Sequence, residues 1–417
     1  MREQGLSNVW RLAWLLCLVI ATSLAQTALV CPSHSEIAPC YCSVKKSGLD
    51  IVCESTDLTH ITKAMAVLKG RPNLMIFYLR LRHNNLPKLQ GYVFLGLDIR
   101  HLTIHNSSLA VLEESSLSSL GTGLTQLDLS QNSLNSVPSH ALKDLHHLLI
   151  LNLNRNKITA IHGRAFEGLD TLEILTLYEN KISTIEADAF KGLDNRRLKR
   201  LNLGGNELTR IPTQALSSLE LLKKLEMQEN RIATIKEGDF EGLKALDSLG
   251  LAHNHLREVP AHVFSHLTQL NSLELDGNQI THVDANAFIG LEGKCINQKL
   301  IRFYFNRLSS FRAILFILSP FCSFTFRVDN PLICDCDLRW YPAWLANLRD
   351  KDDEMMSKKR TVCTMPMEHR EYSVQNIPLE RMGCAGKNAG KFSSSATGCR
   401  VYVDATLPLI VLTAAIV

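Results

Sequence analysis

Aromatic residues and long apolar runs are both scarce in this sequence of 417 residues. Phe, Trp and Tyr make up only 6% of the chain, although 46% of the residues are hydrophobic and leucine is visibly in excess. No apolar run reaches the roughly 20 residues that a membrane-spanning helix needs. We therefore expect a repetitive core built from leucine, and not a core packed around large rings.

Excess charge and catalytic motifs are also lacking. The 45 Lys and Arg residues face 41 Asp and Glu residues, and a net charge of +4 is too small to indicate a nucleic-acid surface. The sequence contains no G-x-S-x-G, H-E-x-x-H, P-loop or G-x-G-x-x-G motif. His262 and His266 have metal-like spacing, but they flank Phe264 at positions expected to face solvent. We expect no enzyme, no cofactor, no metal site and no nucleic-acid partner.

The first 25 residues have the pattern of a secretory signal. Basic residues precede an apolar stretch from Leu12 to Ile20, and Ser23 and Ala25 then form a small-x-small cleavage site. The pattern predicts a mature chain that begins near Gln26. Such a chain would fold in an oxidising compartment, where disulfides persist.

The cysteines support that compartment, because eight of the twelve form two clusters of four. The clusters are Cys31, Cys40, Cys42 and Cys53, and Cys334, Cys336, Cys363 and Cys384. Neither cluster has the paired C-x2-C spacing of a zinc site, so disulfides are favoured. Of the remaining four, Cys17 lies in the predicted signal, and Cys295, Cys322 and Cys399 are left over.

Between the two clusters runs a repeat with the pattern L-x-x-L-x-L-x-x-N-x-L. Its asparagine positions are Asn84, Ser107 (in place of Asn), Asn132, Asn156, Asn180, Asn206, Asn230, Asn254 and Asn278. Successive spacings are 23, 25, 24, 24, 26, 24, 24 and 24 residues. Ten residues after each of these positions stands a Phe or Leu. A nearly constant period of this length indicates a solenoid.

The repeat has a direct physical interpretation. Alternating leucines such as Leu151 and Leu153 predict a short strand with one face inward. The asparagine side chain can satisfy backbone groups of adjacent turns that would otherwise be buried without partners. Stacked coils place parallel strands about 4.8 Å apart, so nine strands form a surface roughly 40 Å long. The prediction is an α/β solenoid with a concave parallel sheet.

These features resemble extracellular leucine-rich-repeat proteins of the typical 24-residue class, a class that includes connectin-like and Slit-like cell-surface recognition proteins. The resemblance covers residues 31–291 and 328–384, where Asn330, Pro331, Cys334 and Cys336 are similar to the start of a C-terminal cap. It implies a horseshoe with disulfide caps at both ends. The implied pairs are Cys31–Cys42, Cys40–Cys53, Cys334–Cys363 and Cys336–Cys384.

The expected organisation follows from these boundaries. It comprises a signal (1–25), an N-terminal cap (26–73), nine repeats (74–292), an anomalous segment (293–327), a C-terminal cap (328–384), a linker (385–406) and an apolar tail (407–417).

The anomalous segment loses the repeat phase and has three interpretations. It could be a divergent coil, with a Cys295–Cys322 disulfide. A membrane span would be interrupted by Arg312 and Pro320. We favour a translated intron or mis-joined exon, because Gly293-Lys294 can encode a donor-like splice sequence and residues 323–327 can encode an acceptor-like one.

The tail predicts a glycolipid anchor. Small residues are followed by a spacer (397–406) and an apolar run of 11 residues (407–417). The anchor candidates are Ser394, Ser395 and Ala396, and cleavage there would also remove Cys399. A frayed tail or a cropped transmembrane helix are the alternatives.

Candidate contacts lie between the inward leucines, where side chains point onto the concave face. The partner-binding candidates are Asn154, Arg155, Tyr178, Glu226, Gln228, Glu229, Glu274 and Asp276. Tyr178 is the only aromatic in the two columns of the face, which otherwise lacks bulk. We expect the face to be basic at its start and acidic at Glu226, Glu229, Glu274 and Asp276.

The sequence therefore predicts a non-catalytic binding protein, secreted or at the cell surface. Its partner would be an extracellular protein or receptor, met in adhesion or recognition through the concave face, with a glycolipid membrane anchor. A soluble ligand-binding or guidance factor is the alternative. Homophilic contact is a further candidate, and glycosaminoglycan binding at the short basic run 358–360 is a weaker one. Asn106 lies in an N-glycosylation sequon, Asn106-Ser107-Ser108.

Overall fold

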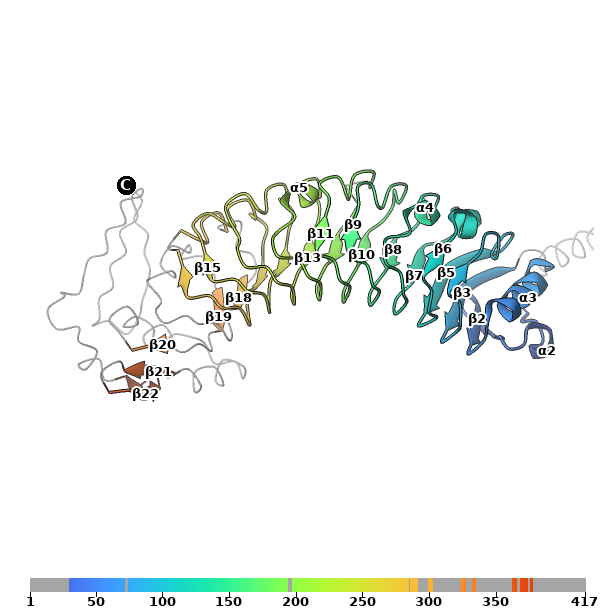
Figure 1. The fold of residues 1–417 in the computed structure, drawn as a ribbon, viewed down its shortest axis with the longest axis horizontal. Helices are drawn as coiled ribbons and strands as arrows, with labels where there is room; N and C mark the ends of the chain where they lie inside the picture. The colour runs from blue at the N-terminus through green and yellow to red at the C-terminus, as the bar shows by residue number, and fades with distance from the viewer. Residues whose placement is uncertain are drawn as a thin grey trace, which may run out of the picture.

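The computed structural model describes most of the repeats and parts of both ends. The described residues are 30–71, 74–193, 197–284, 286–291, 299–302, 324–327, 332–334, 362–365, 368–373 and 376–377. Their coils form an arc with one long sheet along its inner side and short helices along its outer side (Figure 1). The signal, the linker, the tail and the anchor candidates Ser394, Ser395 and Ala396 lie outside the described residues.

The N-terminal cap closes one end of the core. Its elements are α2 (His34–Ile37), β1 (Tyr41–Lys45), β2 (Gly48–Glu54) and α3 (Leu58–Lys69). The hairpin β1–β2 is antiparallel, whereas β2 joins the next strand in parallel. Disulfides join Cys31 to Cys42 and Cys40 to Cys53, the pairs that the resemblance implies. One face of α3 buries four apolar side chains, so the first repeat does not expose its core.

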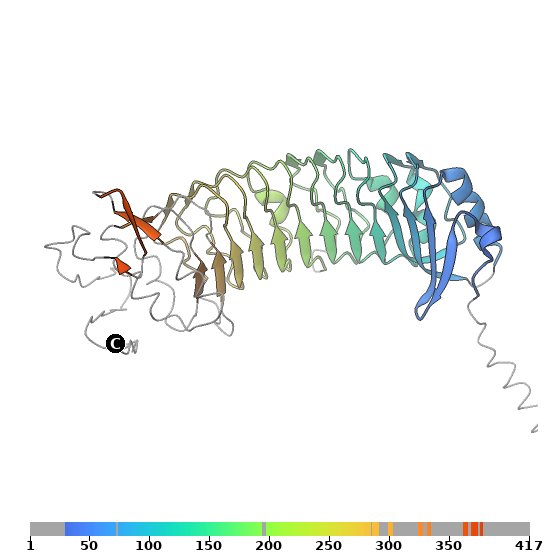
Figure 2. The same ribbon diagram turned by 90° about the horizontal axis from the view of Figure 1, so that it is seen from below.

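The repeats contribute one strand each to the long sheet. These strands are β3 (Met75–Arg82), β5 (Asp98–His105), β7 (Gln126–Asp128), β8 (Ile150–Asn152), β10 (Ile174–Thr176), β12 (Arg200–Asn202), β13 (Lys224–Glu226), β14 (Ser248–Gly250) and β16 (Ser272–Glu274). They pair in parallel and in sequence order, side by side in Figure 2. Leu151, Leu175 and Leu201 pair in register and are fully buried. The predicted solenoid with a concave parallel sheet is confirmed.

The outer side of the arc is irregular and is built from short elements. They are β4 (Lys88–Leu89), β6 (Val111–Leu112), η1 (Glu114–Ser116), η2 (Ser118–Leu120), α4 (Ser139–Leu142), β9 (Ala160–Ile161), β11 (Thr184–Ile185), α5 (Thr213–Leu216), β15 (Glu258–Val259) and β17 (His282–Val283). Phe240 and Phe264 stack beneath this side with ring centroids 5.8 Å apart. The period places these rings at the same position of successive coils, where they stack and fill the core beneath the outer side.

The asparagine ladder ties the coils together through backbone groups. Asn180 is buried, and its Nδ2 donates to the carbonyls of Leu153 at 3.0 Å and Leu177 at 3.1 Å. Its Oδ1 accepts a hydrogen bond from the Ile158 amide at 3.2 Å. Ser107 is likewise buried and accepts from the Asn84 amide, so it occupies the ladder position of its coil.

The residue before each ladder position has a left-handed backbone. This column consists of His83, Asn106, Gln131, Arg155, Glu179, Gly205, Glu229, His253 and Gly277, with φ between 47° and 65°. Because a positive φ is costly for most residues, the turn geometry is evidently imposed by the stacked coils.

The sheet continues into the anomalous segment. Strand β18 (Lys299–Arg302) pairs in parallel with β16, and β19 (Phe324–Arg327) pairs in parallel with β18. Ile301 takes the register position of a repeat leucine, opposite Leu273. These strands agree with the divergent-coil interpretation. The mis-joined exon concerns the gene and stays a prediction, and Cys295 and Cys322 lie outside the described residues.

The described part of the C-terminal cap is small. It contains β20 (Leu332–Ile333), β21 (Val362–Met365) and β22 (Arg370–Ser373) in one three-stranded sheet. A disulfide joins Cys334 to Cys363, whereas Cys336 and Cys384 lie outside the described residues. Within the described parts of the chain, no helix has the length and apolar character to span a membrane.

Candidate binding surface

The inner face of the sheet displays side chains in aligned columns. Asn152, Thr176, Asn202 and Glu226 pair in register on β8, β10, β12 and β13, and Glu274 lies two strands further along. These residues therefore share one column of the inner face. Glu274 and Asp276, at and just after β16, are half-buried.

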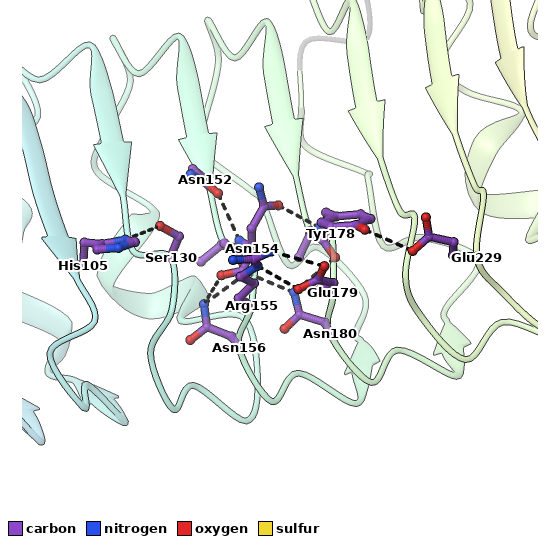
Figure 3. Close-up of polar contacts among 12 residues, drawn as sticks. His105, Ser130, Asn152, Asn154, Arg155, Asn156, Tyr178, Glu179, Asn180 and Glu229 are labelled. Atoms are coloured by element: carbon purple, nitrogen blue, oxygen red, sulfur yellow. Dashed lines mark hydrogen bonds and ion pairs between the residues drawn. The ribbon is translucent and has the colours of Figure 1, made fainter.

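Tyr178 is held on this face by hydrogen bonds from both its backbone and its side chain (Figure 3). Its backbone amide donates to Asn154 Oδ1 at 2.7 Å, and its hydroxyl donates to Glu229 Oε2 at 3.0 Å. Tyr178 and Glu229 are 51 residues apart, so the side chain crosses the whole coil between them. Two of the predicted candidates thus hold Tyr178 in place.

Two glycines in the crossed coil leave room for this arrangement. A Cβ atom at Gly205 would lie 3.0 Å from the Glu179 backbone nitrogen, and one at Gly204 would lie 2.7 Å from Gln228 Nε2. A Cβ at Gly250, in the next coil but one, would also contact Gln228 at 3.3 Å. The Gln228 amide therefore lies over bare backbone. Among the residues that the structure describes, nothing hydrogen-bonds its side chain.

The charges of the face are more balanced than the sequence predicts. Glu226 accepts from Arg200 at 2.8 Å and 3.2 Å, and it also pairs with Lys224 at 3.1 Å. Only 14% of the Glu226 side chain is exposed. The expectation of an acidic surface at Glu226 is therefore wrong, because Arg200 and Lys224 lie one column away.

Arg155 also has an acidic partner. Its Nε lies 2.7 Å from Glu179 Oε2, and both side chains are about half exposed. Such a pair contributes little to stability because water screens it. Its effect is to orient the two side chains beside Tyr178.

Partial burial and acidic neighbours perturb the Tyr178 hydroxyl. Burial is the main cause, and hydrogen bonding to Glu229 and Glu179 adds to it, so that the pKa of Tyr178 rises to about 12 from an ordinary 10.0. The raised pKa means that the neutral hydroxyl is the form that the fold stabilises.

We expect this pKa to be visible in an alkaline titration. The stability that the neutral hydroxyl contributes is fully present below pH 10 and is lost as the pH rises through about 12. Ultraviolet difference titration of the native protein and of Tyr178→Phe isolates this residue, and Glu229→Gln should lower its pKa. Ionisation of Tyr178 near its ordinary pKa of 10.0 would contradict the contact.

A second cluster on the inner face was missed by the sequence prediction. Phe77, Tyr78 and His101 form ring contacts with centroids 4.7–4.9 Å apart. The Arg80 guanidinium lies 4.3 Å from the Tyr78 ring centroid and is bonded to Asp50 at 2.5 Å and 2.6 Å. The expectation that the face lacks bulk except at Tyr178 is wrong.

A bulge explains why this cluster was missed. Between β2 and β3 the register shifts, so that Asp50 pairs with Tyr78 while Leu49 pairs with Ile76. Phe77 is therefore an extra residue on β3, and neither it nor Tyr78 is buried. The interval of three residues between the buried Ile76 and Leu79 was the available signal, since regular alternation gives two.

The half-buried His101 packs against the other two rings of this cluster. Burial is the main cause that lowers the pKa of His101, and the charge of Arg80 lowers it further. The lowered pKa favours the neutral form of the ring. In the described part of the chain, its Nδ1 is buried without a hydrogen-bond partner.

The comparisons with known proteins agree with this architecture. Residues 98–158, 147–195, 196–256 and 246–293 match the family model described as leucine rich repeat. Residues 98–293 are leucine-rich repeats. The same sheet extends beyond the matched residues, to β3 at one end and to β18 and β19 at the other.

Solved structures show the same fold at low sequence identity. A Leptospira interrogans leucine-rich-repeat protein, LIC12759, is 26% identical over 75% of this chain and 69% of its own, with a TM-score of 0.52. The TLR13–ssRNA13 complex gives 22% identity, coverage of 77% and 58%, and a TM-score of 0.51. An octameric complex of latrophilin 3, Unc5D and the leucine-rich repeats of FLRT2 gives 23%, coverage of 74% and 83%, and 0.50. The chain thus spans 58% of the TLR13 chain that it matches.

Proposed function

We propose that this protein is a non-catalytic extracellular receptor that binds a protein partner through the concave face of its repeats, in adhesion or recognition. The observation that carries the proposal is that Tyr178 is hydrogen-bonded through both its backbone and its hydroxyl. A large ring held on both sides loses little freedom when a partner covers it, and tyrosine is enriched among binding hot spots. The FLRT2 repeats, solved with latrophilin 3 and Unc5D, offer an example of a partner class.

The groups around Tyr178 suit a neutral protein surface. The unused Gln228 amide can donate and accept, and Gly204 and Gly250 allow a partner's backbone to approach closely. Glu226 is already paired with Arg200 and Lys224, so its charge should attract a distant partner little. Short-range contacts should therefore contribute more to binding than long-range electrostatic attraction does. A second copy of this protein is one of the partners to be tested. Glycosaminoglycan binding at residues 358–360, which lie outside the described residues, is the weaker candidate because this basic run is short.

The extracellular placement is part of the proposal. The disulfides of the N-terminal cap and the Cys334–Cys363 bond support it, since such bonds persist outside the reducing cytosol. We further propose a cleaved signal over 1–25 and a glycolipid anchor at Ser394, Ser395 or Ala396. Release from intact cells by phosphatidylinositol-specific phospholipase supports the anchor, whereas spontaneous appearance in the medium supports the secreted factor.

A binding screen tests the main proposal. The full chain, secreted and tetramerised, is applied to an array of cell-surface ectodomains that includes its own. Tyr178→Ala should weaken the affinity for a partner so identified by about 2 kcal/mol, roughly thirtyfold. Lys191→Glu, on an exposed residue beside the buried Phe190, serves as the control. Equal loss in both folded variants would place the binding site away from the concave face.

A further inference from the structure

The sequon lies just beyond the end of strand β5, at the edge of the long sheet. Asn106-Ser107-Ser108 is the only N-x-Ser/Thr sequence in the 417 residues. Asn106 follows β5 directly, is exposed, and belongs to the left-handed column with φ 47°. Asparagine tolerates this backbone conformation better than most residues. Ser107 is buried in the ladder, whereas Ser108 is exposed.

The side chain of Asn106 is already oriented in the folded protein. Its Nδ2 lies 2.9 Å from His83 Nδ1, and because an amide nitrogen can only donate, the imidazole nitrogen is the acceptor. An amide nitrogen carries two hydrogens, so this contact uses one of them. The other is available for substitution.

A hollow lies directly beside this contact. It has a volume of about 510 Å³ and is lined by Ser55, Thr56, Asp57, His60, His83, Asn84 and Asn85. His83 is therefore shared by the hollow and the sequon. Hydroxyl, imidazole, carboxylate and amide groups line it, and the Asn84 amide is already bonded to Thr56 and Cys53. The other groups can hydrogen-bond the hydroxyls and the acetamido group of a sugar.

We propose that Asn106 carries an N-linked oligosaccharide whose first N-acetylglucosamine lies against this hollow. The glycan then occupies the edge of the sheet at β3 and β5, which leaves the coils from β8 onward, around Tyr178, to the protein partner. The proposal rests on the extracellular placement proposed above, because the transferase acts in the secretory pathway.

The attachment needs no redox step. The Asn106 Nδ2 forms a bond to C1 of the sugar, and the bond from C1 to the diphosphate of a polyprenyl-linked oligosaccharide breaks. The polyprenyl diphosphate leaves with the electron pair, and Nδ2 gives up one proton to a base of the transferase. The remaining N–H continues to donate to His83 Nδ1.

Glycosidase treatment of the full chain from secretory cells tests the attachment. Peptide:N-glycosidase should produce a single mobility shift, which Asn106→Gln and Ser108→Ala abolish and Ser108→Thr preserves. The oxidation state of Cys31, Cys42, Cys40 and Cys53 is measured in parallel. Oxidised cysteines without a shift overturn the glycan and leave the extracellular placement intact, whereas reduced cysteines overturn both.

Hydrogen exchange tests where the first sugar lies. Amides of residues 54–60 and 83–86 should exchange more slowly in the glycosylated protein than in Ser108→Ala, because the sugar shields the hollow. The coil around Asn230 is distant and should exchange equally in both proteins. Equal exchange of residues 54–60 in the two proteins overturns the placement of the sugar.

Discussion

Replacing Asn180 with alanine is expected to lower the free energy of unfolding by about 1–3 kcal/mol. The amide of Ile158 loses its partner. The carbonyls of Leu153 and Leu177 each lose one of two donors, since Asn156 and Asn206 still donate to them. Each unsatisfied buried group costs about 1–3 kcal/mol.

Denaturant unfolding combined with native-state hydrogen exchange measures this effect. Long repeat arrays can unfold in parts, so the exchange of the Ile158 amide reports the local loss that a global transition would average. Lys181→Ala is the matched control, since Lys181 is adjacent and exposed, and it should change stability by less than about 0.5 kcal/mol. If Asn180→Ala unfolds like this control, the ladder does not hold the coils together.

The central coils were predictable because each coil repeats the same local physics. The spacing of Leu151, Leu175 and Leu201 defines the buried column, and the pairing in register follows from the nearly constant period. Even the replacement of asparagine by Ser107 was predicted, since the phase on both sides fixes the position. The disulfide pairs required the resemblance, because four cysteines alone allow three connectivities.

What the sequence did not reveal depends on contacts between neighbouring coils. The period places Glu226 on the face, but its neutralisation depends on the side-chain conformations of Arg200 and Lys224. Similarly, Gly204 and Gly205 are visible in the sequence, whereas the contact from Tyr178 to Glu229 across them is not. The aromatic cluster at Phe77 depends on a bulge, where the regular alternation fails.

A glycan added beside Tyr178 is expected to abolish partner binding. The double variant Arg155→Asn with Lys157→Ser creates a sequon around the unchanged Asn156. Position 155 suits asparagine because its φ is 56°, and it corresponds by column to Asn106. The Lys157 amide donates to the Leu134 carbonyl through the backbone, so the substitution keeps that bond. The fold should therefore persist while a bulky, hydrated chain covers the Tyr178 ring.

The two single variants are the controls that make this test decisive. Neither Arg155→Asn nor Lys157→Ser creates a sequon by itself, so each reports the side-chain change without the glycan. Losing the exposed pair between Arg155 and Glu179 should cost less than about 1 kcal/mol of affinity or stability. Gln131→Asn creates a sequon with Asn132 and Ser133 one coil nearer to β5, and it should weaken binding less than the double variant does. Because the native sequon lies a further coil away, binding should decrease stepwise as the glycan approaches Tyr178. A glycosylated double variant that binds its partner normally would show that the partner does not contact the face around Tyr178.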